Sequence, residues 1–412
     1  MSDSSHKEHK ERKGWEVKKA KYLWREVSNL SQTGNELLLS VSQYDGVRPS
    51  FEASRSESLK GYKIVEKGDL VINIMLAWMG GLGVSEYDGI VSPAYAVNRP
   101  IAPMEPRFLH YLYRTREYLA EFARRSTGVV PSRWRMYGDD FGQVATKLPP
   151  LAEQEAIVAY LDAETGRIDK AIAAEEKMIA LLQERREIVI NEAVGGGQGD
   201  FSRKERKDRK GWEVRRLKTI STKIGSGKTP KGGADVYSET GILFIRSQNV
   251  YNEGLKLDDV SHISPAIDEG MKGTRVHRND LLLNITGGSI GRCCLYECDE
   301  PANVNQHVCI IRIAKNKAVA EFVRYFINAT AADIVGINQT GGNREGLNFQ
   351  SIGNVSIPIP PLVEQEAIVA RLDEETGKID RAIAVKRRQI ELLRERRQIV
   401  IDEVVTGKVK VA

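Results

Sequence analysis

Apolar residues recur at alternating steps of three and four along two long segments of the chain, at 149–194 and 360–405. This spacing places the apolar side chains in one stripe on a helix and is typical of a coiled coil. The pattern therefore predicts two helices that pair through a shared seam. An amphipathic helix that packs on its own domain is the alternative. The predicted seam residues are Leu161, Ile168, Ile172, Ile179, Leu182, Leu372, Ile379, Ile383, Ile390 and Leu393.

The two segments are copies of each other. They align at a constant offset of 211 residues, with 31 identical residues in 46 positions. Two shorter echoes precede them: RKGWEV at 12–17 and 209–214, and KGDLVINI at 67–74 beside RNDLLLNI at 278–285. The chain therefore consists of two tandem halves, each with an α/β part followed by a long helix.

The copies diverge most in one stretch, where AEEKM at 174–178 aligns with VKRRQ at 385–389. An acidic segment has thus become a basic one. If the helices run antiparallel about a pseudo-twofold axis, these stretches meet near the middle of the pair. Opposite charges there would fix the orientation and the choice of partner. The divergence is therefore compatible with an antiparallel pair of helices.

The parts outside the helices mix strand-like runs, short amphipathic helices and glycine-rich turns, which indicates an α/β fold class. At 412 residues the chain is long enough for two separate cores. We divide it into an α/β domain at 1–148, a long spacer helix at 149–194, a Gly-rich and basic linker at 195–208, a second α/β domain at 209–359, and a second long spacer helix with the C-terminal tail at 360–412.

Charge and hydropathy indicate which kinds of molecule the chain can bind. The net charge is +5, and Lys and Arg cluster at 7–21 and 203–218, which suits a polyanion such as DNA. Solvated linkers are the alternative for these clusters. The N-terminus lacks the apolar segment of a secretory signal, and the most apolar window, at 70–84, is shorter than a bilayer span and contains Asn73. We therefore predict a cytoplasmic protein with no membrane partner.

Signatures of catalysis are missing from the sequence. The stretch IGSGKTP ends like a phosphate-binding loop at Gly227–Thr229, but Thr222 stands where that loop requires glycine. Motifs for methyl transfer, dinucleotide binding and serine hydrolysis are also missing. The sequence therefore predicts a protein with no catalytic residues and no cofactor. Lys228 can still hold a DNA phosphate together with the backbone amides of its loop, and an ordinary surface turn is the alternative.

The four cysteines lie close together in the sequence, which raises the question of a metal site with His307. No pair has the C-x2-C spacing of common zinc modules, and HVCIIRI at 307–313 alternates like a strand. We therefore predict reduced, partly buried thiols and no metal, with a metal site as the alternative. The cysteines are Cys293, Cys294, Cys298 and Cys309.

Each half carries one loop that combines glycine with planar hydrogen-bonding side chains, at 126–140 and at 338–348. Arg, Asn and Gln pair bidentately with guanine and adenine edges, so these loops are predicted to read DNA bases. A solvated loop is the alternative for any single residue. The candidate DNA-binding residues are Arg133, Trp134, Arg135, Tyr137, Lys228, Arg246, Gln248, Asn249, Gln339, Asn343 and Arg344.

The duplicated PPLxEQExIVxxLDxxTxxID segment, the IGSGKTP, GILFIRSQNV and NDLLLNITGGSIGR runs, and INQTGGNREGLN resemble the DNA-specificity (S) subunit of Type I restriction-modification systems. The resemblance covers nearly the whole chain. It implies two α/β target-recognition domains separated by two long helices that form an antiparallel coiled coil with an internal pseudo-twofold repeat. The charged N-terminal tail through Glu11 departs from the family pattern.

The resemblance also implies a function and partners. Each target-recognition domain would read one half of a bipartite, asymmetric site in double-stranded DNA. The two helices would dock two methyltransferase (M) subunits and, through the complex, the restriction and motor (R) subunits. A DNA-binding regulator or architectural protein that acts alone is the main alternative, and a self-sufficient enzyme is a weaker one.

Overall fold

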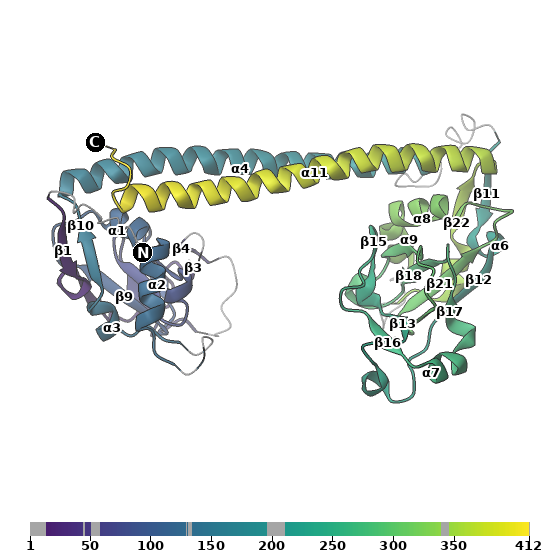
Figure 1. The fold of residues 1–412 in the computed structure, drawn as a ribbon, viewed down its shortest axis with the longest axis horizontal. Helices are drawn as coiled ribbons and strands as arrows, with labels where there is room; N and C mark the ends of the chain where they lie inside the picture. The colour runs from purple at the N-terminus through teal and green to yellow at the C-terminus, as the bar shows by residue number, and fades with distance from the viewer. Residues whose placement is uncertain are drawn as a thin grey trace, which may run out of the picture. The chain divides into compact units, whose positions relative to one another are not determined.

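The structure is a computed structural model that describes residues 14–43, 46–50, 58–128, 130, 134–195, 211–338 and 346–411. The chain forms two compact units. Unit 1 comprises Met1–Glu176 and Arg387–Ala412, and unit 2 comprises Lys177–Lys386. Each unit therefore combines one α/β domain with half of each long helix, α4 (Leu151–Val194) and α11 (Leu362–Val405) (Figure 1).

Unit 1 is built on an antiparallel four-stranded sheet in the order β2 (Trp24–Val27), β9 (Tyr95–Pro100), β6 (Leu70–Asn73) and β7 (Leu82–Val84). Three antiparallel pairs complete the strands: β1 (Glu16–Lys19) with β10 (Ala145–Leu148), β3 (Leu39–Ser42) with β4 (Gly46–Pro49), and β5 (Lys63–Val65) with β8 (Gly89–Val91). The short helices are η1 (Ala20–Tyr22), η2 (Ala77–Met79), α1 (Pro106–Leu112), α2 (Arg116–Arg125) and α3 (Gly138–Gly142).

Unit 2 contains two four-stranded sheets. The first has the order β12 (Ser221–Ser226), β21 (Val308–Ile313), β18 (Leu281–Asn284) and β19 (Cys293–Leu295), and the second β16 (Ser261–Ile263), β13 (Ile242–Ile245), β20 (Ala302–Val304) and β17 (Arg275–Val276). Two pairs are added, β11 (Glu213–Arg216) with β22 (Ser356–Ile359) and β14 (Val250–Tyr251) with β15 (Gly254–Leu255). The helices are α6 (Leu217–Ile220), η4 (Gly233–Val236), η5 (Ser247–Asn249), α7 (Pro265–Gly270), η6 (Lys272–Thr274), η7 (Gly287–Ser289), α8 (Ala320–Ala329), α9 (Ala331–Asn338) and α10 (Phe349–Asn354).

The KGDL and RNDL echo marks a buried ion pair that both units contain. Asp69 and Asp280 are each 1% exposed and accept a hydrogen bond from the backbone amide three residues earlier. Arg99 binds Asp69 with two hydrogen bonds of 3.1 Å, and Arg312 binds Asp280 at 2.7 and 2.6 Å. A buried carboxylate is stable only when it is paired in this way, which accounts for the repeated aspartate.

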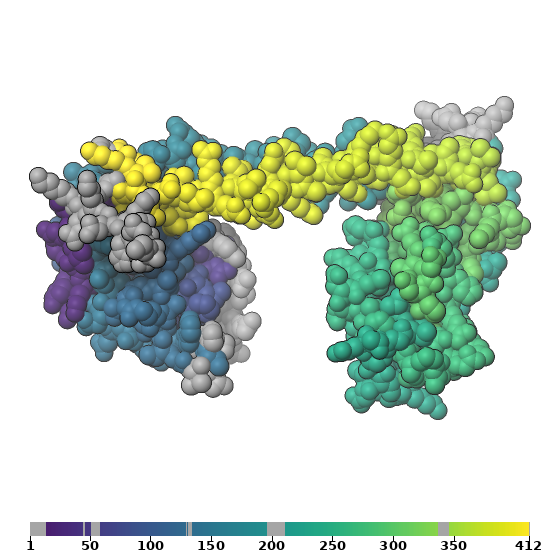
Figure 2. Space-filling model, in the orientation of Figure 1, coloured from purple at the N-terminus to yellow at the C-terminus, as the bar shows by residue number. Residues whose placement is uncertain are grey.

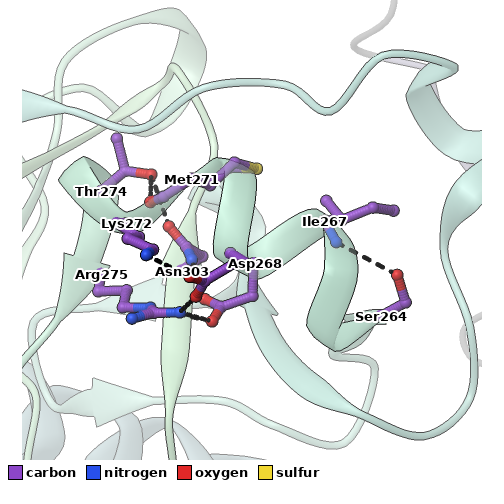
Figure 3. Close-up of polar contacts among 9 residues, drawn as sticks. Ser264, Ile267, Asp268, Met271, Lys272, Thr274, Arg275 and Asn303 are labelled. Carbon is purple, nitrogen blue, oxygen red and sulfur yellow. Dashed lines mark hydrogen bonds and ion pairs between the residues drawn. The ribbon is translucent and has the colours of Figure 1, made fainter.

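A polar cluster fastens α7 to the second sheet of unit 2 (Figure 3). The Asp268 carboxylate is 6% exposed and accepts hydrogen bonds from Arg275 Nε at 2.9 Å and from Asn303 Nδ2 at 2.5 Å. Asn303 Oδ1 in turn accepts a hydrogen bond from the Thr274 hydroxyl at 2.6 Å. These contacts hold β20 in place, and β20 leads directly into the turn at 305–307.

The long helices run antiparallel within each unit. In unit 1, Arg397 Nε donates to Asp169 at 3.0 Å, and in unit 2, Arg186 Nε donates to Asp380 at 3.0 Å. The two ion pairs are equivalent through the repeat, since Arg186 corresponds to Arg397 and Asp169 to Asp380 at the constant offset. All ten predicted seam residues are buried or half-buried. The predicted fold class, with its antiparallel coiled coil and its repeat, is confirmed.

Two seam residues also belong to domain cores. Leu161 lies in the core of unit 1, and Leu372 lies in the core of unit 2. The opposite ends of the helices do the same, since Val404 of α11 packs in unit 1 and Ala193 of α4 packs in unit 2. Pairing and packing on a domain, which were alternatives from the sequence, therefore both occur along one stripe.

Both stretches whose charge differs between the copies form ion pairs. Glu176 of the acidic stretch binds Arg394 at 3.3 Å, and Arg394 lies outside the basic stretch at 385–389. Arg388 of the basic stretch binds Glu391 of its own helix. In the register that places Asp169 beside Arg397, Glu176 lies one turn away from Arg394, and the long arginine side chain spans that distance.

The repeated PPLxEQ sequence joins each long helix to its domain. Gln154 Oε1 accepts from the backbone amide of Glu105 at 2.9 Å, and its Nε2 donates to the Pro149 carbonyl at 2.8 Å. Gln365 makes the equivalent bonds to Val319 at 2.8 Å and to Pro360 at 2.7 Å. The repeat therefore encodes a joint between helix and domain as well as the seam.

The RKGWEV echo belongs to the same joint. The indole of Trp15 donates to Glu153 at 3.4 Å, and that of Trp212 donates to Glu364 at 2.9 Å. Each tryptophan directly precedes a strand that pairs beside the helix start, β1 with β10 and β11 with β22. Sequences almost 140 residues apart in unit 1 are thus repeated together because they touch each other.

We expect Gln365→Ala to destabilise unit 2 by about 2–4 kcal/mol, because two buried backbone groups each lose a partner at roughly 1–3 kcal/mol. Gln365 is fully buried. Gln389→Ala, on an exposed face of the same helix, is the matched control and should change stability little. Urea unfolding of the full chain measures both effects, and equal losses in the two variants would contradict the joint.

Candidate nucleic-acid interface

Four loops of unit 2 meet at one edge of its two sheets. The strand register places the end of β12 beside the start of β21 (Ser226 opposite Cys309) and the end of β18 beside the same point (Asn284 opposite Val308). The parallel strands β13 and β20 end side by side. The loops that follow these strands form what we call the loop cluster, residues 227–229, 246–249, 285–289 and 305–307.

Side chains connect the loops of the cluster to one another. Thr229 donates to Gln306 Oε1, and Gln306 Nε2 contacts His307 Nε2 at 2.9 Å. His307 Nδ1 lies 2.6 Å from the Thr286 hydroxyl. Thr286 also forms a β-bridge with Gly346, where the described chain resumes after 338. Sequence reasoning did not select Gln306, His307 or Thr286 for a DNA interface.

The Gly-rich stretch at 225–229 runs from the end of β12 into this cluster, and its Gly227 is closely packed against β20. A Cβ atom on Gly227 would lie 1.7 Å from the Val304 carbonyl oxygen. The Gly227 amide donates to Val308 O and the Lys228 amide to Val304 O, both at 3.2 Å. These two amides are therefore not available for a phosphate, contrary to the expectation from the sequence. The exposed side chain of Lys228 is the part of the loop that can hold one.

The three candidates at 246–249 have different environments. Asn249 is 2% exposed, and its side chain bonds to Arg246 N, Lys256 O and Asp259 O. It therefore shapes the loop and is not available to a base. Gln248 is exposed and donates to Asp259 Oδ2 at 3.0 Å. The half-buried Arg246 lies over the Tyr237 ring at 5.7 Å.

The loop at 126–140 in unit 1 and the loop at 338–348 in unit 2 are anchored by equivalent backbone hydrogen bonds. Met136 N donates to Ile74 O at 2.8 Å, and the repeat-related Leu347 N donates to Ile285 O at 2.8 Å. In both units the loop thus joins the turn after the central strand, β6 or β18. Most described side chains of the two loops differ, whereas the anchoring position is apolar in both, Met136 and Leu347.

The described candidates of unit 1 lie on or beside this loop. Trp134 packs edge-on against Trp78 with ring centroids 5.3 Å apart. Arg135 donates to the Trp134 carbonyl at 2.8 Å. Tyr137 is 53% exposed and lines a cavity of about 340 Å³ together with Trp24 and other residues. Arg133, Gln339, Asn343 and Arg344 lie outside the described residues.

The cysteines are distributed through the sheets of unit 2. Cys293, Cys294 and Cys309 are buried, and burial raises the pKa of all three thiols, to about 12 for Cys294 and Cys309. A thiolate ligand is therefore unfavourable at these positions. Among the described residues, no three His, Cys, Asp or Glu side chains lie close enough together to hold a metal ion. None of the described helices combines the length and apolarity that a bilayer span requires.

Each long helix also presents apolar side chains outside the seam. Leu181 and Ile188 of α4 are 49% and 48% exposed, and the repeat-related Leu392 and Ile399 of α11 are 48% and 49% exposed. The space-filling view shows part of the α11 surface open in yellow (Figure 2). The two copies of the helix thus expose the same pair of apolar residues, seven positions apart.

Comparison with known proteins agrees with this architecture. The family model described as the Type I restriction modification DNA specificity domain matches residues 209–393. The second α/β domain and most of α11 thus match the DNA specificity domain of Type I restriction-modification systems. The resemblance inferred from the sequence is thereby confirmed, and the repeat extends it to the first half of the chain.

Several family members show how far the similarity extends. The EcoBI specificity subunit of Escherichia coli is 28% identical over 245 residues, which is 55% of this chain and half (50%) of the relative. The MjaVIII specificity subunit of Methanocaldococcus jannaschii is 24% identical over 375 residues, 85% of this chain and 83% of the relative. These relatives are named specificity subunits of restriction enzymes, which agrees with the expectation of a non-catalytic chain.

A solved structure shows the same fold over nearly the full length. It comes from work on complex assembly and conformational transition of the type I R-M system. The TM-score is 0.73 at 15% sequence identity, and the match covers 96% of this chain and 98% of that chain. At this identity the similarity shows that the two chains share a fold.

Proposed function

We propose that the chain is the DNA-binding subunit that gives a Type I restriction-modification complex its sequence specificity. In this proposal the first target-recognition domain, residues 1–148, reads one half of a bipartite, asymmetric DNA site, and the second, residues 209–359, reads the other. The observation that carries the proposal is the pair of equivalent loops, fixed by Met136–Ile74 and Leu347–Ile285 bonds. One scaffold thus presents two loops that differ in most of their side chains.

The proposed partners follow from the repeated helices. Two identical methyltransferase subunits can bind one asymmetric chain only if that chain offers the same surface twice. Leu181 with Ile188, and Leu392 with Ile399, provide such a pair of surfaces. The restriction and motor subunits would then join through the methyltransferases. We propose that the chain itself carries out no catalytic step.

Mapping methylated sites in the genome of a host that expresses the chain with its methyltransferase tests this function. We expect one asymmetric motif with two specified halves and an unspecified gap, because two separate loops contact the DNA. A single contiguous motif would contradict two independent readers. Purification of the chain without any methyltransferase partner would instead support a regulator that acts alone.

A further inference from the structure

Gln306 occupies an exposed position in the loop cluster of unit 2, in the turn between β20 and β21. An exposed glutamine normally samples many rotamers and loses that freedom only when it binds a partner. Here the side chain is already fixed, since Thr229 donates to its Oε1 and its Nε2 contacts His307. The two partners come from the Gly-rich loop and from the neighbouring residue.

His307 determines which way the Gln306 amide points. Gln306 Nε2 can only donate, so His307 Nε2 must accept and carry no proton. The proton of the neutral ring then lies on Nδ1, which donates to the Thr286 hydroxyl 2.6 Å away. Thr286 lies in the turn after β18, so three loops together hold one amide in one orientation.

The fixed amide retains free hydrogen-bonding capacity. An amide oxygen has two lone pairs and an amide nitrogen two hydrogens, and the contacts to Thr229 and His307 occupy one of each. One acceptor and one donor therefore remain on an exposed group. Adenine presents the complementary pair in the major groove, with N6 as donor and N7 as acceptor.

We infer that Gln306 is a specificity-determining residue that reads an adenine in the second half-site. This inference rests on the proposed function, because it requires that unit 2 contact DNA bases. Thr229, His307 and Thr286 are positioning residues that hold the amide before DNA arrives. Such preorganisation improves recognition because the ordering cost is met in the free protein.

Methylome mapping with Gln306→Glu tests the inference. A carboxylate cannot donate to adenine N7 but can accept from cytosine N4, so discrimination for adenine at one position should fall about 5- to 150-fold and cytosine should become acceptable there. Thr229→Val removes one anchor and should weaken discrimination at that same position. Gln350→Glu, exposed on α10 of unit 2, is the charge-matched control and should leave the motif unchanged.

The outcomes separate this inference from the proposed function. A bipartite wild-type motif that Gln306→Glu leaves unchanged, or changes in the first half, contradicts the inference alone. A second half-site that contains no A·T pair would also contradict the inference alone. Gln306→Glu could abolish methylation altogether. In that case, binding of the purified complex is measured with four duplexes that differ only at the base pair that Gln306 is inferred to read. Selective loss for the adenine duplex supports the inference, and equal loss for all four overturns it. A wild-type motif that is not bipartite contradicts the proposed function itself.

Discussion

Replacing Leu392 with glutamate should release one of two bound methyltransferase subunits and leave the other in place. Leu392 is 48% exposed on α11 and lies outside the seam, so its substitution leaves the helix pair intact. A carboxylate forced into an apolar contact lacks a partner, and loss of a central contact of this kind weakens binding by at least ~2 kcal/mol, or roughly 30-fold. Leu181→Glu should release the other subunit, and the double variant should release both.

Native mass spectrometry of the purified complex measures this stoichiometry directly. Gln389→Glu adds the same charge to an exposed position of α11 that is not repeated, since Met178 is its counterpart, and should retain two subunits. A double variant that still binds two methyltransferase subunits would show that these faces are not the docking sites.

Gly227→Ala should have the largest effect on stability. The added Cβ would lie 1.7 Å from the Val304 carbonyl oxygen, so β12 or β20 must move. Overpacking against backbone costs about 3 kcal/mol or more. The Tm of unit 2 should therefore fall by roughly 6–12 °C, at ~2–4 °C per kcal/mol for a unit of this size.

Gly225→Ala is the matched control for this substitution. Gly225 lies in β12, two residues before Gly227, and a Cβ there meets no atom within 4 Å. Calorimetry should show a clear loss for Gly227→Ala and little change for Gly225→Ala. Normal stability in Gly227→Ala together with loss of DNA binding would mean that the glycine serves a bound phosphate instead of the packing of the sheet.

The coiled coil could be predicted from the sequence because its signal is periodic and local. A heptad stripe and a repeat with 31 identities specify the seam without any knowledge of tertiary contacts. The same alignment showed that Gln154 and Gln365 are repeated, but not why. Their partners Glu105 and Val319 are 49 and 46 residues away, and no pattern links such positions.

The DNA interface was harder to predict because exposure depends on tertiary packing. Asn249 has a suitable side chain for reading adenine. In the structure that side chain is buried, and its amide donates to the backbone carbonyls of Lys256 and Asp259. Gln306 was overlooked because an isolated Gln after a strand carries no pattern. The sequence around Gly227 resembles the end of a phosphate-binding loop. In the structure, glycine is required there because the Val304 carbonyl, 77 residues later, leaves no room for a Cβ atom.

Paired substitutions test most directly whether each unit reads its own half of the DNA site. Arg135→Ala changes the loop of unit 1, and Gln248→Ala changes an exposed residue in the loop cluster of unit 2. Each should cost ~1–3 kcal/mol of base discrimination where a bidentate contact is lost. In methylome maps of the two variants, we predict that Arg135→Ala relaxes one half of the motif and Gln248→Ala relaxes only the other. A single substitution that alters both halves, or two substitutions that alter the same half, would contradict the account.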